Sequence, residues 1–198
     1  MVNDKRVVII DEKQQAREGL AALIDDADGF QCIGTFDSIE TALLEIVPDY
    51  TELLLIDIGV PGISGIKKNN PNLPFLVLSV YEDDERIFDA LCAGASGYLL
   101  KKTSPAQLIK GLKDAINGEA VMSPEIAGRI LKFFREIHAP AGSEYQLTPH
   151  EIRILKLLAE GHNYKTASAE LGFNVNMISS DVKQIYEKLQ VLAELVSR

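Results

Sequence analysis

The sequence predicts an α/β protein: a five-stranded parallel sheet with helices on both faces, followed by a small all-α domain. Two observations carry this prediction. Short apolar runs without alternation recur through the first part of the chain, as in strands covered on both faces, and helically spaced segments separate most of them. After residue 146, apolar residues follow helical spacing alone.

The apolar runs give the strands in order. They are VVII (7–10), FQCIG (30–34), LLLI (53–56), FLVLS (75–79) and GYLL (97–100). The segments 14–25, 84–93 and 105–117 each place apolar residues on one helical face. After the third strand, Asn69, Asn70 and Pro71 end the crossover early, so its helix is expected to be stunted.

The second part begins with an amphipathic helix expected over 123–137, with Ser123 as its N-cap and Pro124 at its first position. The polar, aperiodic stretch HAPAGSEYQ is the candidate linker. Three further helices are expected over 147–161, 164–172 and 176–191, the first with a capping box of Thr148 and Glu151. The predicted divisions are a sheet domain (1–120), a linker helix with its linker (121–146) and an all-α domain (147–198).

Charge is unevenly distributed along the chain, whose net charge is −9. Residues 1–142 hold 22 acidic and 14 basic residues, a net charge of −8, and residues 143–198 hold 7 and 6. Neither part has the strong basic excess of many nucleic-acid binders. The two cysteines fit no metal spacing, and neither a membrane span nor a signal peptide is visible. We therefore expect a cytoplasmic protein with reduced thiols and no membrane partner.

Chemically active side chains follow four of the five predicted strands. Asp11 and Glu12 follow the first strand and Asp57 the third, while Ser79 ends the fourth and Lys101 follows the fifth. Each residue alone is more often a turn or surface residue. Neighbouring parallel strands end at the same edge of a sheet, however, so these side chains are expected to converge.

The expected cluster suits phosphoryl transfer. Three converging carboxylates repel one another unless a cation neutralises them, and their oxygens suit Mg²⁺. Asp57 would then attack a phosphoryl group and become an acyl phosphate, with Lys101 neutralising charge on the transferred group. The sequence therefore predicts that Asp57 is a phosphoacceptor and that Mg²⁺ is its cofactor.

These motifs together resemble a known family. DE (11–12), LLLIDIGVPGISG (53–65), LSV (78–80) and GASGYLLKKTSP (94–105) are similar to the motifs of receiver domains in bacterial two-component response regulators. LTPHEIRILKLLAEG (147–161) resembles the first helix of a LuxR-type helix-turn-helix. Over nearly its whole length the chain looks like a NarL/FixJ-class transcriptional regulator, with a flavodoxin-like receiver fold.

The resemblance implies roles for individual residues. A sensor histidine kinase would phosphorylate Asp57, and the backbone carbonyl of Gly59 would join Asp11, Glu12 and Asp57 around Mg²⁺. Ser79 would be the switch hydroxyl, and Tyr98 the aromatic side chain whose rotamer follows it. Phosphorylation would favour one of two receiver conformations, which exposes a homodimer surface or releases the output domain.

The chain departs from this family at three places. GIKKNNPNLP (65–74) is shorter than the family's third helix and loop by about two helical turns. In the DNA-reading helix, Ser179 replaces the family's lysine and Asp181 adds an acid, which weakens phosphate binding. LQVLAELVSR (189–198) lacks several residues of the turn before the last helix. The candidate DNA contacts are Lys165, Thr166, Ser179, Lys183 and Gln184.

Three functions remain open at this point. The architecture favours a phosphorylation-controlled, DNA-binding regulator of transcription, whereas the altered reading helix favours an output domain that acts through protein partners. An aspartate-nucleophile phosphatase or phosphotransferase would need an acid two residues after Asp57, where Gly59 stands. We therefore expect that the chain is not an enzyme.

Overall fold

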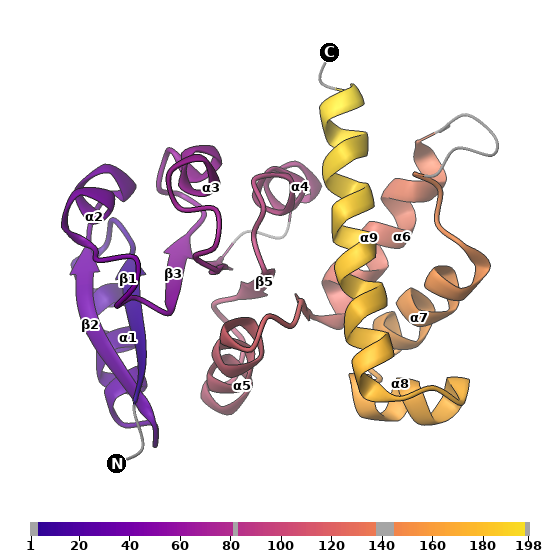
Figure 1. Cartoon of the computed structure of the whole chain (residues 1–198), viewed down its shortest axis with the longest axis horizontal. Helices are drawn as coiled ribbons and strands as arrows, with labels where there is room; N and C mark the ends of the chain where they lie inside the picture. Colours follow the sequence, from indigo (N-terminus) through magenta and orange to yellow (C-terminus); the bar gives the residue numbers. More distant parts are fainter. Residues whose placement is uncertain (1–3, 81–82, 138–144, 197–198) are drawn as a thin grey trace.

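The computed structural model describes residues 4–80, 83–137 and 145–196, with side chains up to residue 192. Its first part is a parallel sheet in the order β2-β1-β3-β4-β5-β6 (Figure 1). The strands are β1 (Lys5–Ile10), β2 (Phe30–Phe36), β3 (Leu53–Asp57), β4 (Phe75–Ser79), β5 (Gly97–Leu100) and β6 (Val121–Met122). The parallel sheet and all five predicted strands are confirmed, and β6 is an additional sixth strand.

Helices cover both faces of the sheet, as predicted. One face carries α1 (Gln14–Asp25) and α5 (Pro105–Ile116), and the other carries α2 (Ile39–Glu45), α3 (Ile66–Asn69) and α4 (Asp84–Cys92) (Figure 1). Alternate residues of β1 and β3 belong to two separate hydrophobic clusters, one on each face. This double burial explains why the strands read as uninterrupted apolar runs.

The helix between β3 and β4 is stunted, as the sequence predicts. A 3₁₀ turn over Ile63–Gly65 leads into α3, which has four residues and ends before Asn70. The helix α2, by contrast, is not among the predicted elements. This helix has only seven residues, and its Leu44 is 83% exposed. Its apolar residues therefore do not all lie on the buried face, and they give no clear helical pattern in the sequence.

The C-terminal part consists of helices. They are α6 (Pro124–Glu136), α7 (Pro149–Ala159), α8 (Tyr164–Leu171) and α9 (Val175–Val196). The N-cap Ser123 of α6 and the capping box of Thr148 and Glu151 are confirmed. Residues 138–144 of the expected linker lie outside the described residues. Val121 and Met122, expected at the start of the linker segment, instead form β6 against Gly97 and Tyr98.

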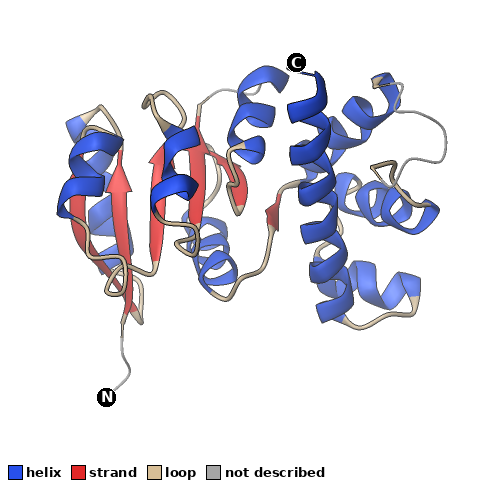
Figure 2. Ribbon diagram, turned by 45° about the horizontal axis from the view of Figure 1, so that its top comes forward, coloured by secondary structure: helices blue, strands red, loops and turns tan. Residues whose placement is uncertain are grey.

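The helix α9 is longer than the predicted segment 176–191. It runs unbroken for 22 residues because the chain has no glycine or proline after Gly172. In Figures 1 and 2 it stands between the sheet domain and α6–α8, and it packs against α4. One hydrophobic cluster includes both Ile87 of α4 and Ile185 of α9, so a continuous core joins the two parts. Within the described ranges, none of the helices has the length and apolar character needed to cross a membrane.

Candidate functional site

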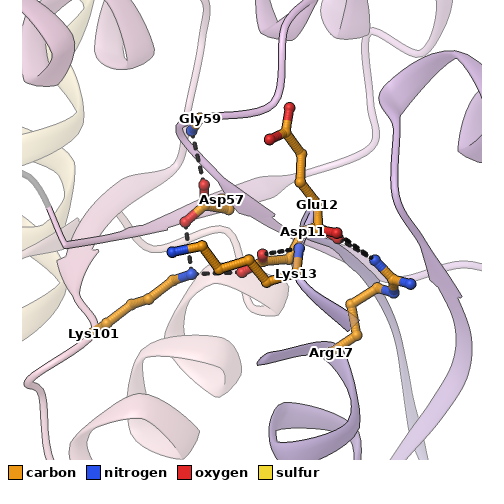
Figure 3. A network of polar contacts seen from close by, with 7 residues as sticks. All are labelled: Asp11, Glu12, Lys13, Arg17, Asp57, Gly59 and Lys101. Atoms are coloured by element: carbon orange, nitrogen blue, oxygen red, sulfur yellow. Dashed lines mark hydrogen bonds and ion pairs between the residues drawn. The ribbon is translucent and has the colours of Figure 1, made fainter. Parts of the chain in front are cut away.

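The candidate site lies at the carboxyl edge of the sheet. Asp57 is the last residue of β3, Asp11 follows β1, and Lys101 follows β5. Neighbouring parallel strands deliver these side chains to the same edge, where doubly wound sheets hold their ligands. Figure 3 shows the lysine between the two carboxylates, which come from segments far apart in the sequence.

Lys101 bridges the two aspartates. Its Nζ lies 2.5 Å from Asp11 Oδ2 and 2.7 Å from Asp57 Oδ1. The remaining carboxylate oxygens accept backbone hydrogen bonds, Asp11 Oδ1 from Lys13 N at 2.9 Å and Asp57 Oδ2 from Gly59 N at 2.8 Å. Asp11 is buried, with 2% of its surface exposed, while Asp57 is more open. The site thus presents one accessible carboxylate, fixed at both of its oxygens.

The protonation of Lys101 reflects these two neighbours. Burial lowers the pKa of its ammonium group, but the hydrogen bonds and charges of Asp11 and Asp57 outweigh burial and raise the pKa above its ordinary value of 10.5. Lys101 is therefore a cation at neutral pH, and it offsets the repulsion between the two carboxylates.

Gly59 fits closely against the Asp57 carboxylate. A Cβ atom at Gly59 would lie 2.8 Å from Asp57 Oδ2, so any side chain would push the carboxylate aside. The close fit lets the backbone N–H of Gly59 reach the carboxylate.

Glu12 lies apart from the pair that Lys101 joins. It is exposed, and its carboxylate points away from Lys101 (Figure 3). Arg17 donates hydrogen bonds to the backbone oxygens of Asp11 and Glu12, at 2.6 and 3.1 Å. Among the described residues, no three metal-binding side chains are close enough together to form a metal-ligand group. The structure therefore brings Asp11, Asp57 and Lys101 together, and leaves Glu12 at the rim.

Ser79 and Tyr98 form a buried pair next to this site. Both residues are fully buried, and the Tyr98 side chain hydrogen-bonds Ser79. Burial raises the pKa of the Tyr98 hydroxyl, while the hydrogen bond to Ser79 acts in the opposite direction. Ser79 ends β4, and Lys101 N donates to its carbonyl oxygen at 2.7 Å.

The candidate DNA contacts lie on α8 and α9. Lys165, Lys183 and Gln184 are exposed, whereas Ser179 is half-buried. Thr166 is exposed as well, but its hydroxyl completes the capping box of α8. Three of the five candidates are therefore exposed without a capping role.

Asp181 has a partner that sequence reasoning missed. Its Oδ2 lies 3.0 Å from Nε2 of His150 on α7, and the His150 ring contacts Phe173 edge-on at 4.7 Å between centroids. No local signal in the sequence links two residues 31 positions apart. The acid that seemed to oppose DNA binding is thus directed toward α7.

Comparisons with known proteins agree with this geometry. A phosphoacceptor-type carboxylate beside a lysine, at the carboxyl edge of a doubly wound sheet, defines a receiver-type domain. A family model described as the response regulator receiver domain matches residues 7–113, more than half of the chain. The chain therefore belongs to the response regulator receiver family.

Relatives also match beyond the receiver. The transcriptional regulatory proteins YdfI and LiaR of Bacillus subtilis are 31% and 30% identical to this chain. The alignments cover 93% and 94% of the chain, and 89% and 91% of the relatives. A solved structure of RcsB dimers bound to DNA is 24% identical with a TM-score of 0.59, covering 95% of this chain and 93% of that one. This likeness confirms the fold of the receiver and of the helical output part.

Proposed function

We propose that this response regulator accepts a phosphoryl group on Asp57 from a sensor histidine kinase and thereby controls DNA binding by α7–α9. The observation that carries the proposal is the pair of contacts from Lys101 to Asp11 and Asp57 at the receiver edge. The full-length match to transcriptional regulatory proteins supports the output role.

The chemistry at Asp57 is a displacement at phosphorus. A carboxylate oxygen of Asp57 attacks the phosphoryl group, the bond from phosphorus to the donor breaks, and an acyl phosphate results. Lys101 is placed to contact the transferred oxygens, because its Nζ already lies 2.7 Å from Asp57 Oδ1. The Gly59 N–H holds the other carboxylate oxygen in place.

The donor set at this edge fits Mg²⁺. The carboxylates of Asp11 and Asp57 are close enough for one cation, the Lys101 ammonium, to contact both, and the exposed Glu12 is next to Asp11 in sequence. When bound, Mg²⁺ would neutralise charge on the phosphoryl oxygens. Asp11, Glu12, Asp57 and the carbonyl of Gly59 are the proposed ligands.

Contacts of α4 join the receiver to the linker helix α6. Ser79 ends β4 beside the site, and α4 begins at Asp84 shortly after it. Asp84 forms an ion pair with Arg129 of α6 at 2.5 Å, and Phe88 of α4 stacks against Phe133 of α6 at 4.1 Å between ring centroids. We propose that movement of Ser79 toward the phosphoryl group loosens these contacts and frees α9 from α4.

The proposed DNA-binding face combines Lys165, Lys183 and Gln184 with the partly buried Ser179 and the capping Thr166. Lys183 lines a cavity against the receiver in this structure, so this face would become complete only after α9 is freed from α4. Asp181 does not point into this face, because His150 holds its carboxylate. Lys165 and Lys183 would contact phosphates, and their small number predicts modest affinity with a shallow salt dependence.

The test is selection of DNA from a random-sequence pool by the full-length protein, with and without Mg²⁺ and a small-molecule phosphodonor. We expect sequence-selective enrichment that grows with the phosphodonor and falls with salt. The Asp57→Asn variant should show no response to the donor. Failure to enrich any sequence in either state would contradict the DNA-binding role and leave the receiver chemistry intact.

A further inference from the structure

A second charged site lies at the opposite, amino edge of the sheet. The loops that lead into β4, β5 and β6 line an open cavity of about 610 Å³, and α9 lines its side toward the output part. Cavities of small-molecule sites span about 300–1,000 Å³. We call it the amino-edge cavity; its polar lining includes Lys67, Asn72, Ser96, Lys183 and Gln190.

The two lysines reach this cavity from different parts of the molecule. Lys67 belongs to α3 of the receiver and Lys183 to α9. Burial lowers the pKa of Lys67, and the positive charge of Lys183 lowers it further. Glu119 and Glu187 also line the cavity, yet within the described chain neither forms an ion pair with either lysine. The lining thus carries two ammonium groups and two carboxylates, and among the described residues neither lysine is in an ion pair with these carboxylates.

Lys67 is held in place, unlike a typical surface lysine. Its Nζ donates to the backbone oxygens of Pro71 at 3.2 Å and Leu73 at 3.0 Å. Its stem lies over Gly94, where a Cβ atom would come within 2.9 Å of Lys67 Cγ. These contacts fix the ammonium group at the wall of the cavity and leave one of its three N–H donors for a ligand.

The short α3 contributes to this arrangement. Because the helix ends after four residues, the chain turns at Asn70 and brings Pro71 and Leu73 back under the Lys67 ammonium. A departure from the family pattern thereby coincides with a fixed cation beside a cavity.

We propose that the amino-edge cavity binds a phosphate-bearing dianion between Lys67 and Lys183, and that the bound anion holds α9 against the receiver. A dianion offsets the repulsion between the two ammonium groups and accepts charge-assisted hydrogen bonds from both. The amide of Asn72 and the hydroxyl of Ser96 are additional donors on the lining. The regulatory meaning of this closure rests on the proposed function, whereas the binding itself does not.

The test is calorimetric titration of the full-length protein with pyrophosphate, inorganic phosphate and a nucleoside diphosphate, without Mg²⁺ and at constant ionic strength. We expect saturable binding of one anion per chain, weakened about tenfold or more in Lys183→Gln. Lys68→Gln is the matched control, because Lys68 is exposed on the same short helix and lies outside the cavity lining. Tighter binding of the nucleotide than of pyrophosphate would identify a nucleotide site, and equal binding a simple phosphate site.

Two outcomes would overturn the proposal. One is the absence of saturable binding, and the other is binding that Lys183→Gln leaves unchanged. Lys183 is exposed on α9, so this variant folds even if Lys67→Gln does not. Amide hydrogen exchange of α4 and α9 should also slow with pyrophosphate in the natural protein and not in Lys183→Gln. Neither readout uses DNA or a phosphodonor, so failure of the proposed function would leave this test intact.

Discussion

The two edges of the receiver sheet both place lysines beside a site, but they balance charge in opposite ways. At the carboxyl edge, one ammonium group lies between the carboxylates of Asp11 and Asp57. At the amino edge, the ammonium groups of Lys67 and Lys183 act on each other across a cavity. The first edge has an excess of negative charge and suits a further cation, whereas the second holds a fixed ammonium group, that of Lys67, close to Lys183 and suits an anion between the two. The comparison teaches that a lysine can have opposite effects: it stabilises the carboxyl edge by offsetting negative charge, whereas at the amino edge two lysines repel each other.

The largest expected effect is the loss of phosphoryl acceptance in Asp57→Asn. The amide cannot form an acyl phosphate, so labelling by a small-molecule phosphodonor in Mg²⁺ should disappear completely. Intact-protein mass spectrometry measures the labelled fraction, with Asp49→Asn at an exposed position as the control. Labelling of Asp57→Asn at the natural level would show that another residue is the acceptor.

The second largest expected effect is a loss of stability in Lys101→Met. Removing the ammonium group leaves the buried carboxylate of Asp11 facing Asp57, and we expect a loss of about 2 kcal/mol in the free energy of unfolding. Because the pKa of Lys101 is raised in the folded protein, its contribution is complete below pH 10.5 and disappears as the pH rises through the folded value. The difference between the natural protein and Lys101→Met in urea unfolding should therefore shrink at alkaline pH. A constant difference across that range would contradict the proposed ion pairing.

A smaller loss is expected at the amino edge in Tyr186→Phe. The Tyr186 hydroxyl donates to the carbonyl oxygen of Val121 at 2.7 Å, which fastens α9 to β6. Removing it leaves a buried carbonyl without this donor and lowers the free energy of unfolding by about 1 kcal/mol. Urea unfolding measures the change, and Tyr50→Phe at an exposed position should leave stability unaltered. Equal effects of the two substitutions would contradict a specific role of the α9 contact.

The smallest expected effect is a gain in stability in Lys183→Gln. Without an added anion, neutralising Lys183 removes a repulsion and should raise the free energy of unfolding by a few tenths of a kcal/mol. The gain should vanish at high salt, where the repulsion is already screened. Replacing Lys183 would then stabilise the protein at the amino edge, whereas replacing Lys101 destabilises it at the carboxyl edge. A loss of stability in Lys183→Gln equal to that in Lys101→Met would contradict the comparison.

The sequence was sufficient to predict the sheet and the position of the candidate site. Strands buried on both faces leave an unambiguous apolar signal, and parallel topology then brings Asp11, Asp57 and Lys101 to one edge. The stunted α3 was also predictable, because Asn and Pro residues end a helix through local chemistry.

The remaining features depend on contacts between distant segments. The two-residue strand β6 is defined by its pairing with β5, and Tyr164 and Tyr186 bind the carbonyl oxygens of Ala120 and Val121 around it. The contact of His150 with Asp181 and the cavity between α3 and α9 likewise require the folded arrangement. Local spacing carries no information about such pairs.

The unbroken α9 has a mechanical consequence. At about 1.5 Å per residue, its 22 residues form a rigid rod of about 33 Å. Its first turns carry the proposed reading face, and further along it the side chain of Gln190 donates to the carbonyl oxygen of Leu91 in α4. The first turn of α9 lies about 22 Å from that contact, so a tilt of about 10° there would displace it by roughly 4 Å, which is about one base-pair step of about 3.4 Å. A small rotation of α9 where it contacts the receiver would therefore displace the proposed reading face by a distance comparable to the spacing of base pairs.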